Sequence, residues 1–292
     1  MIDLSKLPPP DLLDTLDYEA IYQAKLERFK SLCPAWSAAL ESDPVVKLLE
    51  LSAYDELLLR ARINDAAKAS LLAYATKEDL DNRAADYGVS RLLISPANPD
   101  ASPPAEAVYE DDSRLRYRCQ MAFEGLAAAG PAGAYVFHAL SASPLVADVA
   151  VDSPQPGEVR VTILPADRSP ASAGLLAVVS DYLSADERRP LSDTVRVQGA
   201  ALTDFRIDAT LMVYPGPSPA PVLESARAAL DTYLASVSRI GHDVTLSGLY
   251  AALHQPGVER VQLNAPTADV TVDRTGAARC ISIVLREGTA DV

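Results

Sequence analysis

The feature that most constrains this chain is a long helix predicted near its start. Asp43 followed by Pro44 is a strong helix start, because Asp caps helices well and Pro is tolerated in the first turn. No further proline or glycine follows until Gly88. A helix over 43–75 would contain about 33 residues and measure roughly 50 Å at about 1.5 Å per residue. Few helices of globular domains are that long.

The apolar residues of this helix do not form the single stripe of an amphipathic surface helix. One row, spaced by four, begins at Val45 and ends at Leu57, and other apolar residues lie around it. Such a helix needs cover on two or three sides, either from helices of its own chain or from partner chains. Few other helices are predicted in this region, which favours partners. The residues expected at a partner contact are Leu49, Tyr54, Leu57, Arg60 and Asn64.

The spacing of apolar residues, interrupted by proline and glycine, predicts both helices and strands in the rest of the chain, an α+β fold. Helices are expected over 17–31, 77–87, 111–126, 134–142, 171–185, 222–239 and 246–253. Strands are expected over 145–151, 159–164, 194–197, 205–214, 258–263, 270–272 and 281–285. We therefore predict an N-terminal helical region with one long helix (1–97), a linker with connecting helices (98–142), and two small repeated α/β modules (143–200 and 201–292).

The two modules contain similar sequence segments, which indicates an internal repeat. The segment from Pro144 onward matches the segment from Pro256 onward at a constant offset of 112 positions. A second pair of segments, at 181–183 and 232–234, lies on one helix of each module. The pattern predicts two helix–strand modules, each with one sheet face under its helices. Duplicated modules without a shared polar cluster favour a spacer or docking role over catalysis.

The negative net charge makes some classes of binding partner unfavourable. The 292 residues carry a net charge of −14, which disfavours both nucleic acid and anionic membranes. No stretch approaches the roughly 18 apolar residues of a membrane-spanning helix, and no signal peptide pattern begins the chain. We expect a soluble protein made in the cytoplasm, with no nucleic acid and no membrane partner. Cys33, Cys119 and Cys280 are too few and too widely spaced for a disulfide framework or a zinc site.

Motifs with known catalytic or cofactor chemistry are not found. The three histidines lie far apart, and there is no dinucleotide-binding, P-loop or nucleophile-elbow motif. Neighbouring carboxylates such as Asp111 and Asp112 point in different directions on a helix. We expect no catalytic, cofactor-binding or metal residues, and no enzyme. The alternative is an α/β enzyme with an unrecognised site, which predicts a deep pocket where titratable groups of strongly shifted pKa converge.

A family resemblance lies on the long helix and the segment after it. Its most specific block is ESDPVVKLLE at 41–50, followed by Tyr54, Leu58 and RARINDAA at 60–67. The likeness continues through LAYA at 72–75 and YGVSRL at 87–92, and resumes at AGP (129–131) and at PGV (256–258). These residues resemble the baseplate J-like family, the baseplate wedge proteins of contractile phage tails and related particles. The proline-rich stretch at 215–221 is less typical of the family.

The resemblance implies a structural part of the baseplate, the plate at the tip of the tail. Family members form wedges by bundling their N-terminal helices. The implied partners are a second copy of the chain, another baseplate wedge protein, the small sheath-initiator protein and the central hub and spike. The C-terminal modules would join wedges into a ring around the hub and change orientation on contraction. The host particle can be a phage, a bacteriocin or another contractile injector.

Overall fold

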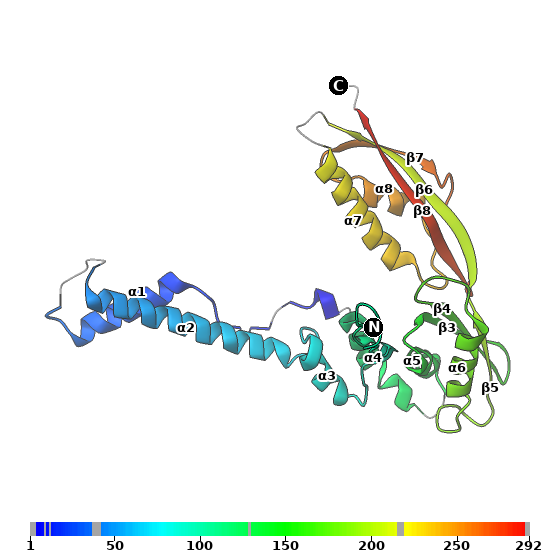
Figure 1. The fold of residues 1–292 in the computed structure, drawn as a ribbon, viewed down its shortest axis with the longest axis horizontal. Helices are drawn as coiled ribbons and strands as arrows, with labels where there is room; N and C mark the ends of the chain where they lie inside the picture. Colours follow the sequence, from blue (N-terminus) through cyan, green and yellow to red (C-terminus); the bar gives the residue numbers. More distant parts are fainter. Residues whose placement is uncertain are drawn as a thin grey trace. The chain divides into compact units, whose positions relative to one another are not determined.

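The computed structural model describes residues 4–8, 10–11, 13–36, 42–127, 130–214 and 219–289. The chain forms two compact units. The helical unit contains residues 1–91 and 111–120, and the α/β unit contains 92–110 and 121–292. The architecture is α+β, as the sequence predicts (Figure 1).

In the helical unit, two helices lie side by side (Figure 1): α1 (Tyr18–Leu32) and α2 (Pro44–Ala69). A carboxylate caps each of them. Asp17 Oδ1 accepts a hydrogen bond from the Ala20 N–H at 3.0 Å, and Asp43 Oδ1 accepts one from the Val45 N–H at 2.8 Å. Both helix starts confirm the sequence prediction. A short 3-10 helix, Leu4–Lys6, precedes α1.

The long helix is shorter than the sequence suggests. It ends at Ala69 after 26 residues, so the prediction of a helix up to residue 75 was wrong. Turns follow, and Arg116 binds two of their carbonyl groups: its Nε donates to Leu72 at 2.8 Å and its Nη2 to Ala75 at 2.6 Å. Arg116 lies on α4 (Asp112–Met121), so the group that stabilises the turns is more than 40 positions along the chain. No local pattern reveals it.

A short helix, α3 (Lys77–Ala85), comes next, and Gly88 follows it with φ +67°. Arg91 ties this segment to α4. Its Nε pairs with Asp81 at 2.6 Å, and its Nη2 pairs with Asp112 at 2.7 Å. The other oxygen of Asp112 accepts the Lys77 N–H at 3.0 Å, which satisfies a free donor at the start of α3.

The α/β unit begins with a two-stranded antiparallel ribbon of β1 (Leu93–Ser95) and β2 (Val108–Tyr109). A further bridge joins Asn98 to Ala105, so the predicted linker over 98–105 forms the turn end of this ribbon. After a 3-10 turn, η2 (Glu124–Leu126), the first sheet has the order β3-β4-β5. Its elements in chain order are α5 (Ala132–Ala142), β3 (Val146–Gln155), β4 (Glu158–Pro165), α6 (Ala173–Leu183) and β5 (Thr194–Gly199).

The second sheet has the order β7-β6-β8. Its elements are β6 (Ala201–Val213), α7 (Ala220–Val237), α8 (Leu246–Leu253), β7 (Val258–Ala265) and β8 (Gly276–Thr289). The strand predicted at 270–272 was wrong, because Val270 forms only an isolated bridge with Val244. Residues 215–218 of the proline-rich stretch lie outside the described residues.

Both sheets share one layout. Each has a central strand with an antiparallel neighbour on one side and a parallel neighbour on the other. A helix precedes each antiparallel edge strand (α5 before β3, α8 before β7), and a helix follows each central strand (α6 after β4, α7 after β6). The chain visits these two helix–strand pairs in opposite order in the two modules. The sequence repeat itself remains a prediction.

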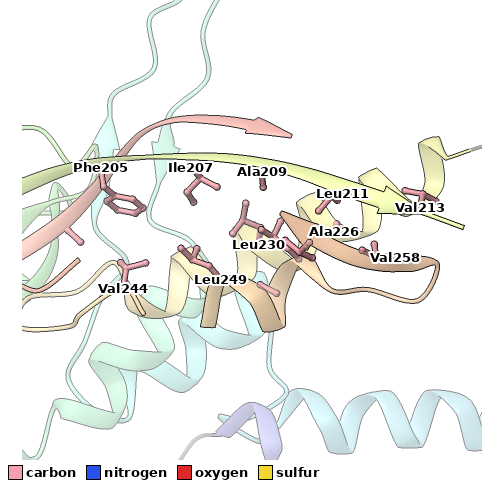
Figure 2. Close-up of a cluster of buried hydrophobic side chains, with 14 residues drawn as sticks. Phe205, Ile207, Ala209, Leu211, Val213, Ala226, Leu230, Val244, Leu249 and Val258 are labelled. Carbon is pink, nitrogen blue, oxygen red and sulfur yellow. The ribbon is translucent and has the colours of Figure 1, made fainter. Parts of the chain in front are cut away.

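The core of the second module lies between its sheet and its helices. On β6, every second residue from Phe205 to Val213 is buried, and these side chains face α7 and α8 (Figure 2). Leu230 of α7 and Leu249 of α8 are fully buried against them. Alternation of period two is what a strand with one covered face requires.

Candidate assembly interface

The long helix α2 has one face covered by its own chain. Val46, Ala53 and Asn64 are buried there, and their spacings of seven and eleven keep them on one side of the helix. Ala53 is fully buried on this side. From α1, Ile21 is buried as well.

Asn64 fixes the chain segment that precedes α1. Its Nδ2 donates to the Asp14 carbonyl and its Oδ1 accepts the Asp14 N–H, both at 2.8 Å. Further along, the Tyr74 hydroxyl donates to the Leu7 carbonyl at 2.8 Å. These side-chain contacts attach the N-terminal segment to α2 and to the turns after it.

A groove of about 400 Å³ lies between α1 and α2, with charged side chains along its walls. Glu56 joins the two helices: its carboxylate pairs with Lys25 of α1 at 2.7 Å and with Arg60 at 2.6 Å. Hydrogen bonds from Lys25 and then Arg60 lower the pKa of Glu56. Glu56 and Arg60 are four residues apart on α2, the spacing at which side chains of one helix meet.

The opposite side of α2 is uncovered. We call it the outer face; its members are large apolar residues, each between 51% and 65% exposed: Leu48, Leu51, Tyr54, Leu58, Leu59 and Ile63. At roughly 100° per residue they occupy about half of the helix circumference. Asp55 and Arg62 are exposed between them. A cluster of this kind on a single helix is typical of a surface that another protein covers.

The structure divides the five predicted contact residues between the two sides of α2. Tyr54 lies on the outer face, 51% exposed. Leu49 and Leu57 are partly covered, Arg60 is bound to Glu56, and Asn64 is buried against the N-terminal segment. The structure therefore brings four of the five toward contacts within this chain.

Of the five predicted contact residues, only Tyr54 belongs to the outer face, because apolar residues surround α2 and the sequence does not show which side its own chain covers. A row spaced by four drifts by about 40° at each step around the helix. Spacings of seven and eleven do not drift in this way. The buried set of Val46, Ala53 and Asn64 has these spacings, so it marks the covered side, and the outer face is its complement.

Among the described residues, no group of three or more His, Cys, Asp or Glu side chains could hold a metal ion. Within the same part of the chain, no helix is long and apolar enough to cross a bilayer.

The chain matches three models of one protein family. These are the baseplate J-like N-terminal domain over 41–98, the central domain over 127–199 and the C-terminal domain over 205–286. The chain is also 44% identical to "Baseplate protein J" of Escherichia phage P2, over 100% of this chain and 99% of that protein.

Among solved structures, a chain of the anti-feeding prophage baseplate matches 63% of this chain with 17% identity and a TM-score of 0.39. This chain spans 43% of that chain. Because the identity to the phage P2 protein extends over both chains almost completely, membership does not depend on a single domain. The chain belongs to the baseplate J-like family and is a structural component of a tail baseplate.

Proposed function

We propose that this chain is a wedge subunit that links neighbouring wedges into a ring around the central hub. In this proposal the helical unit assembles with other wedge chains, and the C-terminal modules join wedges and change orientation on contraction. The observation that carries it is the 44% identity to a phage baseplate protein over the whole length of the chain.

The outer face of α2 supports assembly through the helical unit. Its six large apolar residues are more than half exposed in the single chain. Covering them with another helix removes apolar surface from water, at roughly 25 cal/mol per Å². We propose that a second copy of the chain and another baseplate wedge protein cover this face. The small sheath-initiator protein and the hub and spike complex are the other proposed partners.

The five residues predicted from sequence keep a place in this proposal. Tyr54 would contact the partner directly. The other four residues would contribute indirectly, by holding α1 and the N-terminal segment against α2. These residues are Leu49, Leu57, Arg60 and Asn64. The direct contacts are then extended to Leu48, Leu51, Leu58, Leu59 and Ile63.

A structural rather than an enzymatic role agrees with the chemistry of the groove. An acid–base site needs a carboxyl group whose pKa lies near neutral pH. The pKa of Glu56 is shifted the other way, because Lys25 and Arg60 stabilise its charged form. Glu56 is therefore suited to an ion pair between two helices.

Substitution on the two sides of α2 tests the proposal. Leu58→Asp changes an outer-face residue, and Leu57→Asp changes its partly covered neighbour. We expect Leu58→Asp to leave the chain folded by circular dichroism but to abolish co-purification with the other baseplate proteins. Leu57→Asp should instead lower the stability of the isolated chain. Leu191→Asp, at a position 92% exposed in the α/β unit, controls for the added charge. Normal assembly of the Leu58→Asp chain would contradict the proposal.

A further inference from the structure

The two modules of the α/β unit are joined without a free linker. Strand β5 ends at Gly199 and β6 begins at Ala201. The Ala200 N–H donates to the Ile163 carbonyl of the first sheet at 2.9 Å, and the Ala201 N–H donates to the Thr275 carbonyl beside β8 at 3.1 Å. Consecutive residues are therefore held by different modules, and no residue between them is left to act as a hinge.

An apolar contact fills the junction. Ile240, in the segment after α7, is 8% exposed and packs with Leu164 of β4 and Ala277 of β8. Leu164 is 1% exposed and Ala277 is fully buried. The partly buried residues Ala150, Ala200 and Leu202 pack around them. Side chains from both modules thus form a small shared core, separate from the main core of the second module.

Polar contacts hold the same segment on both sides. Asp148 of β3 accepts the Ile240 N–H through Oδ2 at 2.8 Å. Arg168, in the loop after β4, donates through Nη1 to the Ser238 carbonyl at the end of α7. Two residues of the first module therefore bind the backbone of the second module on either side of position 239.

Arg168 is held firmly in place. Its φ is +58°, a left-handed conformation that costs a non-glycine residue energy, so the surrounding contacts must stabilise it. Its N–H donates to Pro165 at 3.0 Å, and its carbonyl accepts from Arg279 of β8 at 3.5 Å. Arg279 is itself bound to both carboxylate oxygens of Asp204, at 2.6 and 2.7 Å.

The environment of Arg168 makes its contacts costly to break. Burial lowers the pKa of its guanidinium; the charge of Asp148 acts in the opposite sense, and Arg239 lowers it further. A partly buried cation that loses its acceptors is left with an uncompensated charge, which is strongly unfavourable. Domains joined in one chain usually move relative to each other unless their interface is well built. This junction combines a direct strand link, a shared core and buried polar contacts.

We infer that Asp148 and Arg168 lock the two α/β modules into one rigid arm. For its role in contraction the inference rests on the proposed function: the arm would reorient as a whole, and the angle between its two sheets would stay fixed. Asp148 and Arg168 are positioning residues in this device.

A distance measurement between the modules tests the lock in the full chain. Spin labels at Ala177→Cys on α6 and Ala228→Cys on α7 occupy exposed positions in the two modules. Cys33 and Cys280 are replaced by serine, and buried Cys119 is kept. We expect one narrow distance distribution by pulsed electron spin resonance. Arg168→Ala and Asp148→Ala should broaden it, and the Ile240 amide should lose its protection from hydrogen exchange in Asp148→Ala.

Arg196→Ala is the matched control, because Arg196 pairs with Glu158 within the first sheet. It should leave the distribution narrow. A broad distribution in the parent chain, or a narrow one in folded Arg168→Ala and Asp148→Ala, would overturn the inference. If Arg168→Ala fails to fold, Arg168→Gln removes the charge with less loss of volume and is judged by the same result. The distance measurement needs only the isolated chain. A result against the lock is therefore distinguishable from a failure of baseplate assembly.

Discussion

Leucines on the helices of the two units differ in how far they are buried. In the second α/β module, Leu230 and Leu249 are fully buried under a sheet of the same chain. On α2, Leu48 and Leu59 are 65% and 61% exposed. Apolar residues alternate on β6 and so face one side, whereas on α2 they surround the helix, and α1 covers only one side. The second module thus covers its apolar helix residues with its own sheet, whereas the helical unit leaves one side of α2 exposed.

Truncating one leucine in each unit should give the largest difference in stability. Leu230→Ala removes a fully buried side chain, and we expect it to lower the free energy of unfolding by about 2–5 kcal/mol. Leu58→Ala should change it by less than about 0.5 kcal/mol, because that side chain is 51% exposed. Denaturant unfolding of the isolated chain measures both. Equal losses would mean that the outer face is covered within the chain.

A second prediction concerns the turns that end α2. Arg116→Ala removes the donors that bind the Leu72 and Ala75 carbonyls, and should lower the stability of the helical unit by about 1–3 kcal/mol. Faster amide exchange in the turns after Ala69 would accompany the loss. Arg62→Ala, at an exposed position on α2, removes the same charge and should have little effect. Similar losses in the two variants would show that charge, and not the carbonyl contacts, is responsible.

Removing the cap of α2 should have a smaller effect. Asp43→Ala deletes the acceptor of the Val45 N–H, which should cost about 1 kcal/mol of helical-unit stability. Asp43→Ser supplies another capping oxygen and should recover most of it. Thermal unfolding followed by circular dichroism compares the two. Equal stability of Asp43→Ala and the parent chain would contradict the assigned cap.

The smallest predicted effect is a pH dependence of the contact between α1 and α2. Lys25 and Arg60 lower the pKa of Glu56 below its ordinary value of 4.5. The stability that the ion pairs of Glu56 add to the folded chain is therefore fully present above pH 4.5. It is lost as the pH falls through the lowered pKa. Comparing the parent chain with Glu56→Gln between pH 6 and 3 isolates this contribution: the difference in stability should shrink toward acidic pH. A difference that does not change with pH would exclude the ion pair as its source.

Local patterns predicted most of the fold. The Asp43-Pro44 start of α2 and the glycine after α3 are local signals, and both helices are present. The end of α2 depends on Arg116, and the contact of Asn64 with Asp14 joins residues 50 positions apart. A pattern along the chain does not contain such partners. The outer face could not be separated from the buried side of α2, because apolar residues surround this helix and the sequence does not show which side its own chain covers.

We propose that other chains of the baseplate bury the outer face of α2. A cryo-electron-microscopy reconstruction of the assembled particle would show whether they do. We expect neighbouring wedge chains to cover Leu48, Leu51, Leu58, Leu59 and Ile63, while Val46 and Ala53 stay buried within this chain. A reconstruction in which these five side chains stay exposed to solvent would contradict it.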